Sequence, residues 1–361
     1  MNRGLTAVIL TIGLSIVGYG GYALGQSALP STVRSAATIT DENRSTIASF
    51  QKAQIAKLTG NTIKARNDGR DALVNAVVGG EPGPQLAFID AYAEALNDAL
   101  MPLTDDQSML TRLNVAIVVG RVAERTGSLR LKPIVIKLLA DKADPVVLWG
   151  AKAAGPLIRA QMRVKVSPDD KLLTGLVSAI QDNLSGPVAQ AGYEALRLNL
   201  PQDRDSLSDA MLQATIPYMQ KLLTARTAIY QDVFPDVPVS DTLATTFLVD
   251  SKVWKAQSPE QRLTTVQLIV DILALGSRRA AALSTKDDQA DREDVVQTLK
   301  LVGSAVHVIA DAGGKASLAS AADAVMKLDA ANDGATITKT CDAMVAVLAG
   351  EFKGVKVPAA K

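Results

Sequence analysis

Apolar residues recur every three or four positions along most of the chain, with glycine and proline between the runs. This period is typical of amphipathic helices. Ser167 and Ser258 each precede a proline, with Asp170 or Gln261 at the capping-box position, which marks two helix starts. No segment alternates apolar and polar residues between hairpin turns, so we expect an all-α fold with essentially no sheet. The predicted helices lie near 46–59, 62–79, 85–100, 107–126, 129–141, 145–162, 169–183, 187–199, 206–231, 241–254, 259–283, 290–312, 315–330 and 334–352.

The stretch DPVVLWGAKAAGPL, residues 144–157, has a counterpart 42 residues later. Asp141 and Asp182 both lie in the turn before the repeated helix, one residue out of register. Proline is tolerated at the start of that helix, because the missing N–H would have no partner there. Small residues further along allow another helix to approach closely. The aligned pairs are Ile134 with Leu176, Leu138 with Ile180, Pro145 with Pro187, Val146 with Val188, Gly150 with Gly192 and Ala153 with Ala195.

On these residues, the segment 108–200 resembles a HEAT-type α-helical repeat. In that family two antiparallel helices are joined by a short turn that carries Asp and Pro, as in ADKADP (140–145) and QDNLSGP (181–187). The spacing falls in the family's range of about 40–47 residues. The family's basic residue after the turn is missing, since Leu148 and Gln190 stand near its place. The resemblance implies hairpins stacked as a solenoid; the alternative is a non-repetitive helical domain with two similar hairpins.

The second half of the chain has longer predicted helices. Val295, Leu299, Val302, Val306 and Ile309 follow alternating spacings of four and three, which is typical of a helical bundle. We therefore expect a C-terminal bundle that follows the polar joint LPQDRDSLS. The predicted organisation is a signal peptide or membrane anchor (1–25), a linker (26–45), helical hairpins with HEAT-like repeats (46–204), a helical bundle (205–352) and a frayed tail (353–361).

The N-terminus has the layout of a secretory signal. Arg3 precedes an apolar stretch over 5–17, and the small residues of ALG (23–25) would place cleavage before Gln26. The run 5–24 is also long enough to span a bilayer uncut, so an exported protein and a single-pass membrane-anchored protein both fit. Both place the rest of the chain outside the cytosol, in the periplasm or another extracytoplasmic space. GYGGYA in this region matches a dinucleotide fingerprint, but the glycine and proline that follow would break the helix it requires.

Composition narrows the classes of function. Hydrophobic residues make up 48% of the 361 residues, which is enough for a substantial core, and aromatic residues only 4%. The 38 basic and 37 acidic residues nearly balance, and no basic stripe with interleaved aromatics occurs, which argues against nucleic-acid binding. A single cysteine rules out an intrachain disulfide, and a single histidine rules out metal sites built on two histidines.

Each candidate for chemistry has a structural interpretation that we prefer. His307 lies at a helix flank without a nucleophile motif, and Cys341 shares an apolar helix face, so we expect a hydrogen-bonded histidine and a buried thiol. GGKAS (313–317) lacks the full phosphate-loop spacing and reads as a helix end. Paired carboxylates are expected to cap helices, and the tryptophans to lie in the core. The carboxylate pairs are Asp105–Asp106, Asp169–Asp170 and Asp287–Asp288, and the tryptophans are Trp149 and Trp254. The pair Arg278–Arg279 is too isolated to form a nucleic-acid site.

The sequence thus singles out no catalytic, cofactor-binding or metal-binding residue. We expect an exported or membrane-anchored helical-repeat scaffold of the cell envelope that is not an enzyme and that binds another protein. Contact with a membrane would occur only through the N-terminal segment, if it stays uncut. Two alternatives stay open: an enzyme or small-ligand binder with a carboxylate-lined cleft between the two halves, and a self-associating structural envelope protein.

Overall fold

The computed structural model describes residues 28–79, 83–163, 170–181, 183, 185–197, 209–229, 239–283 and 289–358. Every regular element in these ranges is a helix, which confirms the predicted all-α class. The predicted signal or anchor (1–25), the joint at 200–208 and the cap residue Ser167 lie outside the described residues.

The first part of the chain forms nine α-helices and two short 3₁₀ helices. They are α1 (Ser31–Arg34), α2 (Asp41–Leu58), α3 (Ile63–Asn75), α4 (Leu86–Leu100), η1 (Met101–Asp105), α5 (Met109–Thr126), η2 (Leu129–Leu131), α6 (Lys132–Leu139), α7 (Asp144–Arg163), α8 (Asp170–Gln181) and α9 (Gly186–Arg197). The later helices are α10 (Asp209–Ile229), α11 (Val239–Leu248), α12 (Ser251–Ala256), α13 (Pro259–Ala282), α14 (Gln289–Gly313), α15 (Ala316–Met326) and α16 (Gly334–Glu351). The expected helix 241–254 is two helices, because Asp250 accepts a hydrogen bond from the Lys252 amide and starts α12 anew.

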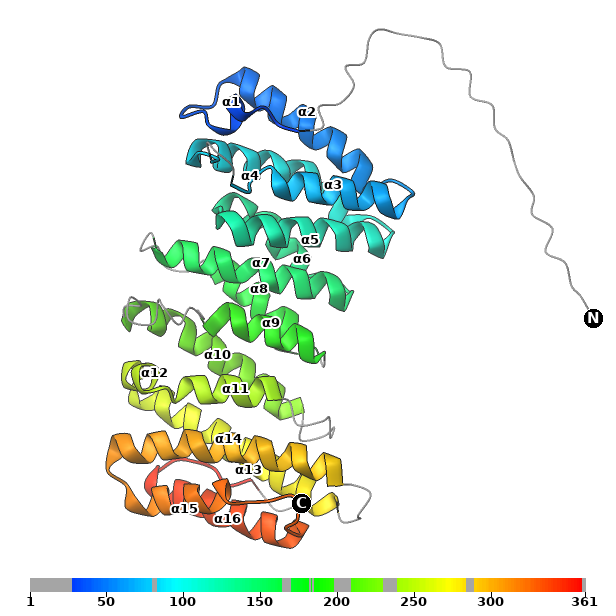
Figure 1. Ribbon diagram of the computed structural model, residues 1–361. Coiled ribbons are helices and arrows are strands. Elements are labelled where there is room, and N and C mark those ends of the chain that lie inside the picture. The colour runs from blue at the N-terminus through cyan, green and yellow to red at the C-terminus, as the bar shows by residue number, and fades with distance from the viewer. Residues whose placement is uncertain are drawn as a thin grey trace, which may run out of the picture.

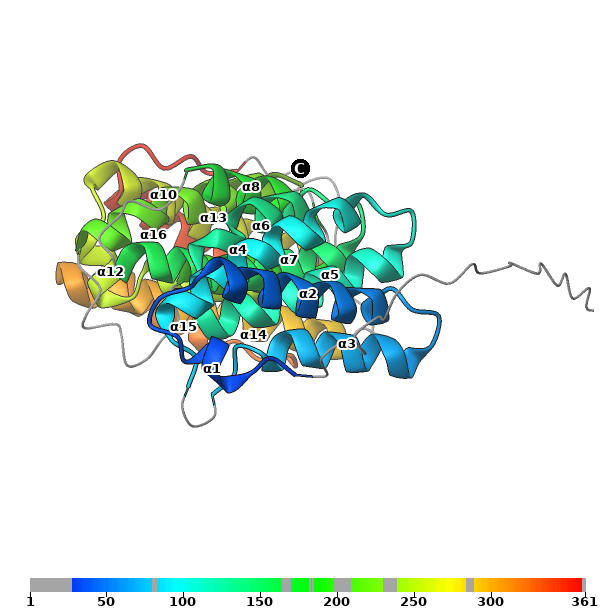
Figure 2. The ribbon, with the colours of Figure 1, turned by 90° about the horizontal axis from the view of Figure 1, so that it is seen from above.

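Helices that alternate along the chain contact one another, which sorts them into two layers. The first layer contains α6, α8, α10 and α13, and the second contains α5, α7, α9, α11 and α14, each helix packing on the next of its layer. Figure 1 shows the resulting stack, which runs from α2 at one end to α15 and α16 at the other. Seen from above in Figure 2, α2 and α3 lie in front of the later helices. At the C-terminal end the order reverses, since α15 packs on α14 and α16 packs on α13.

The turns between paired helices use the same local hydrogen bond. Asp106, Asp141 and Asn183 each accept a hydrogen bond from the backbone N–H two residues on, at 2.7, 2.8 and 2.8 Å. This Asx turn redirects the chain into the next helix. Asn183, 42 residues after Asp141, is therefore the in-register equivalent of Asp141, and Asp182 is not.

Close packing at small residues positions α7. A Cβ added at Gly150 would lie 3.1 Å from the backbone nitrogen of Leu139 in α6, so only glycine allows this approach without adjustment. Ala153 and Ala154 are fully buried, as expected for the face that nests on neighbouring helices. The helix continues through Pro156 to Arg163.

Two hydrophobic cores run along the stack. The first extends from Leu29 in the N-terminal segment to residues of α10 and α11, and the second is built mainly by α13–α16. Helices α10 and α11, which the sequence assigned to the bundle, also pack on α8 and α9. A polar seam of Gln220, Gln257 and Thr265 joins the cores: Gln220 Nε2 donates to Thr265 Oγ1 at 3.0 Å, which donates to Gln257 Oε1 at 2.7 Å.

Both predicted flexible segments include ordered, packed residues. Within the expected linker 26–45, Leu29 and Val33 are buried, and Thr40 caps α2 by accepting a hydrogen bond from the Asn43 amide. In the expected frayed tail, Lys356 exchanges two backbone hydrogen bonds with the side chain of Gln267, at 2.7 and 3.0 Å. These segments belong to the fold because apolar contacts and paired backbone groups offset their loss of chain entropy. Residues 359–361 lie outside the described residues.

Candidate functional site

A groove opens on the second layer, between α5, α7 and α9, with a volume of about 320 Å³. Small residues make its floor: Gly120 on α5, Gly155 on α7, and Ala191 and Ala195 on α9. A Cβ added at Gly155 would lie 3.2 Å from Ala195 Cα, so the floor is formed where two helix backbones nearly touch. The groove is therefore shallow, because its floor consists of helix backbone and small side chains that are themselves nearly buried.

Trp149 forms one wall of this groove. Its ring covers Gly120, where an added Cβ would lie 2.7 Å from the ring carbon Cε3. The indole is half-buried and packs against the first hydrophobic core, so it lies at the edge of that core. Lys152 lies one turn further along α7 and places its Nζ 4.9 Å from the ring centroid, which is a cation–π contact. Tryptophan is among the residue types enriched at the positions that contribute most to binding in protein interfaces.

Charged side chains surround the floor in a fixed order. Glu124 on α5 and Glu194 on α9 flank the groove on its two sides, while Lys152 and Arg159 stand on α7 between them. Glu194 accepts a hydrogen bond from Gln190 at 2.8 Å, whereas Glu124 and Lys152 are exposed to solvent. The charge sequence across the three helices is thus negative, positive, negative.

Local sequence explains the geometry of the groove. Pro156 lacks an N–H, so it cannot bond the carbonyl four residues earlier in α7. Gly155 beside it permits the near-contact with α9. In the sequence these residues indicate a helix break and close packing. The groove itself is not visible there, because Glu124 and Glu194 reach it from other hairpins. A tryptophan followed by small residues at helical spacing was the available signal.

A second pocket, of about 340 Å³, lies at the turns beside α5 and α6. At its base Arg112 Nε donates to Asp141 Oδ2 at 2.7 Å, and Lys137 pairs with Asp105 at 2.9 Å. Burial raises the pKa of Asp141, but hydrogen bonds from Arg112 and the backbone together lower it by more. The pKa of Asp141 therefore lies below its usual value. Arg112 and Lys137 are thus matched by carboxylates, and we interpret the pocket as a structural feature that fixes the turn.

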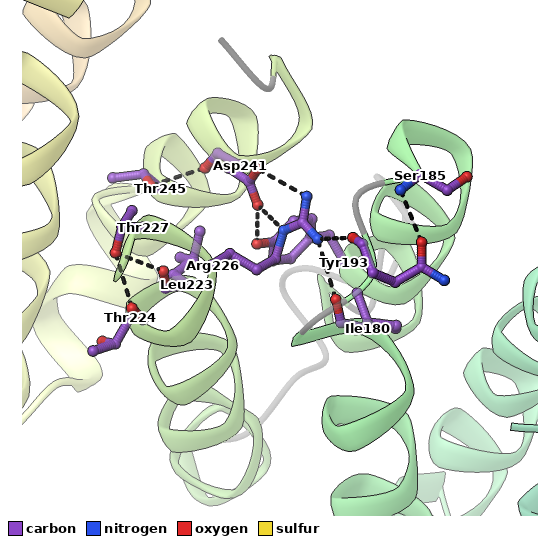
Figure 3. A network of polar contacts seen from close by, with 10 residues as sticks. Ile180, Ser185, Tyr193, Leu223, Thr224, Arg226, Thr227, Asp241 and Thr245 are labelled. Atoms are coloured by element: carbon purple, nitrogen blue, oxygen red, sulfur yellow. Dashed lines mark hydrogen bonds and ion pairs between the residues drawn. The ribbon is translucent and has the colours of Figure 1, made fainter. Parts of the chain in front are cut away.

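The most buried charges form a network between two hairpins. Arg226 on α10, 2% exposed, donates to both carboxylate oxygens of Asp241 on α11, at 2.7 and 3.3 Å. Its Nη1 also donates to the carbonyl oxygens of Ile180, at 3.1 Å, and Asn183. The Tyr193 hydroxyl donates to Asp241 as well. Figure 3 shows these side chains pointing toward one another. The network therefore connects α8 and α9 to α10 and α11.

His307 joins two helices through carboxylates. Its Nδ1 lies 3.2 Å from Asp311 Oδ2 on the same helix, and its Nε2 lies 3.5 Å from Asp323 Oδ1 on α15. The ring is 35% exposed. The histidine thus has one hydrogen-bond partner, Asp311, as expected at a helix flank, and a second carboxylate, Asp323, nearby.

Cys341 lies in the second core, and burial raises the pKa of its thiol to about 12. Asp106 caps the turn before α5, and Asp170 begins α8, as expected for paired carboxylates near helix starts. The partners Asp169 and Asp287–Asp288 lie outside the described residues.

Lys315 of the GGKAS segment does not stand free to bind phosphate. Its Nζ lies 2.8 Å from Glu351 Oε2 and 4.6 Å from the centre of the Phe352 ring, at the junction of α14 and α15. Arg278 and Arg279 are both half-buried on α13. Trp254 lies in the second core with Arg262 over its ring, which confirms the expected core position.

Carboxylates with a raised pKa do not gather in these pockets. Burial raises the pKa of Asp271 on α13, although a hydrogen bond from Gln267 lowers it in part. Asp271 lines neither the groove nor the turn pocket, nor a third pocket of about 330 Å³ between α11 and α14. Among the described residues, no group of three His, Cys, Asp or Glu side chains is placed to hold a metal ion.

One helix in the described part of the chain, Asp291–Gly313, is long and apolar enough to cross a membrane. Just over half of its apolar window, 56%, is buried against neighbouring helices, as in the core helix of a folded domain. The predicted N-terminal span lies outside the described residues.

Comparison with known proteins does not add a relative. No family model matches the chain, and no curated protein matches it. One solved structure, of an engineered protein, aligns over 83% of this chain and 96% of its own, with 14% identity and a TM-score of 0.27. That similarity is too low to support an argument about fold or function, so the chain is characterised by its own residues.

Proposed function

We propose that this chain is a non-enzymatic helical scaffold that binds another protein. The observation that carries the proposal is the groove between α5, α7 and α9, with a half-buried Trp149 beside a floor of glycine and alanine. Aromatic side chains at the edge of a shallow pocket are the usual anchors of protein interfaces. Small residues on the floor let a partner approach the helix backbones.

A HEAT-type arrangement is part of the proposal. The pairing of α6 with α7 and of α8 with α9 follows the 42-residue spacing, and their turns share the Asx hydrogen bond. Arg112, soon after the turn at Asp106, pairs with Asp141 of the following turn. A basic residue therefore links neighbouring hairpins, although Leu148 and Gln190 occupy the later places.

We also propose that the scaffold acts outside the cytosol, exported or held by an N-terminal anchor. The support is the sequence alone: Arg3, the apolar run over 5–17 and the small residues at 23–25. A scaffold at this location would present its groove to other proteins of the cell envelope.

Affinity capture of the intact chain from detergent-solubilised membrane and soluble fractions tests the proposal. We expect a partner protein that re-forms a complex of fixed stoichiometry with the purified chain in light scattering. The N-terminal peptide from the same sample, read by mass spectrometry, begins at Gln26 if the signal is cleaved. If no protein is retained above a tag-only control, with or without prior cross-linking, the scaffold function is wrong.

A further inference from the structure

We propose that the groove between α5, α7 and α9 binds a segment of a partner protein in which a large apolar side chain stands beside an acidic residue. This inference rests on the proposed scaffold function and specifies what the scaffold recognises. It follows from three features of the groove: the size of its apolar floor, the place of its cations and the order of charges across it.

The floor accepts one large apolar side chain. The groove has a volume of about 320 Å³, which is at the lower end of the range for ligand pockets. A folded domain is too large to enter it. Gly155, Ala191 and Ala195 offer no polar side-chain group, and Trp149 adds an aromatic wall. An inserted aliphatic or aromatic side chain would lose water against all four residues.

The cations of the groove stand on its central helix. Lys152 Nζ lies over the Trp149 ring, and among the described residues no carboxylate lies within ion-pair distance of it. A carboxylate placed there can pair with the ammonium group while the cation–π contact is kept. Arg159, about two helical turns further along α7, adds positive charge on the same side. The acidic residue of the partner therefore belongs above α7.

The order of charges disfavours a second copy as the occupant. Glu124 and Glu194 lie on either side of the α7 cations. If two copies of the chain packed groove to groove about a twofold axis that passes through α7, Lys152 of one copy would lie close to Lys152 of the other. The two positive charges would repel each other. A partner segment with a central carboxylate, and with basic or neutral residues to either side, is complementary instead.

Selection of displayed peptides on the full chain tests the inference. We expect the enriched peptides to carry Asp or Glu beside a large apolar residue. Lys152→Glu should weaken binding of a selected peptide at least tenfold, and changing the peptide's acid to Lys should restore binding to that variant. Lys221→Glu is the matched control, because Lys221 is an exposed lysine on α10 in the other layer, and it should leave binding unchanged.

Fluorescence locates the peptide independently. Binding should shift the indole emission of the wild-type chain, and the shift should vanish in Trp149→Phe, which keeps an aromatic wall. Peptides without acidic enrichment, or peptides that bind Lys152→Glu as well as wild type, would overturn the inference, as would the failure to select any peptide. The scaffold function is judged separately, because its test is the capture of a partner by the intact chain and not the selection of peptides: a captured partner together with a failed selection would overturn this inference alone.

Discussion

The buried Arg226 network allows a quantitative prediction. Arg226→Met removes the guanidinium that faces Asp241 and leaves a carboxylate of 2% exposure with the Tyr193 hydroxyl near it. Breaking a buried pair on one side costs about 3–5 kcal/mol, because the remaining charge stays desolvated. The carbonyl oxygens of Ile180 and Asn183 lose a donor in the same step. We therefore expect the free energy of unfolding to fall by about 3–5 kcal/mol.

The paired variant separates charge from packing. Arg226→Met combined with Asp241→Leu removes both charges, and replacing a whole buried pair by apolar residues is close to neutral. The double variant should therefore be clearly more stable than Arg226→Met alone. Lys221→Met makes a similar change at an exposed site of α10 and should stay within about 0.5 kcal/mol of wild type.

Urea denaturation followed by helical circular dichroism measures these differences. Hydrogen exchange adds the location: protection of α8 and α9 should fall together with that of α10 and α11, because Arg226 joins the two hairpins. The reasoning is refuted if Arg226→Met loses less than about 1 kcal/mol. It is refuted equally if the double variant loses as much as the sum of the two single variants.

Three further predictions concern packing, pH and thiol chemistry. An added Cβ at Gly69 would lie 2.6 Å from a backbone oxygen of α2, so Gly69→Ala should cost about 1–3 kcal/mol in thermal unfolding, whereas Gly186→Ala, in open space, should not. The pKa of Asp141 is lower in the folded state than in the unfolded state, where it is about 3.9. The contribution of Asp141 to the free energy of unfolding is therefore fully present above the unfolded pKa and is lost as the pH falls through the folded pKa. The difference in urea midpoint between wild type and Asp141→Asn should therefore shrink from pH 6 toward pH 2, and a constant difference would contradict this. Cys341, with a pKa raised to about 12, should react with a thiol reagent only in denaturant, and rapid labelling of the native chain would show that it is accessible.

Local rules predicted the helices well. The capping box at Ser258 is present in both directions, since the Gln261 amide donates to Ser258 Oγ and the Ser258 amide donates to Gln261 Oε1. Gly150 and Ala153 pack closely, as their spacing indicated. These features involve residues a few positions apart, so the sequence contains most of the information needed.

Contacts that depend on how the hairpins stack could not be predicted from the sequence. Arg226 reaches Ile180, and its partner Asp241 reaches Tyr193, only because separate hairpins pack side by side. Nothing in the local pattern marks this arginine. The exposure of Trp149 depends likewise on α5 and α9 leaving its outer edge uncovered. Periodicity identifies which residues face inward, but it does not say which helix covers them.

The polar seam between the two cores has a consequence for elasticity. Apolar contacts are non-directional, so helices can slide slightly on one another at little cost, whereas hydrogen bonds weaken steeply when bent. The buried Gln220, Thr265 and Gln257 side chains fix α10 to α13 by such directional bonds. Under load the stack should therefore yield by small shifts within each core, and the boundary between the cores, where a hinge would be sought first, should be its stiffest part.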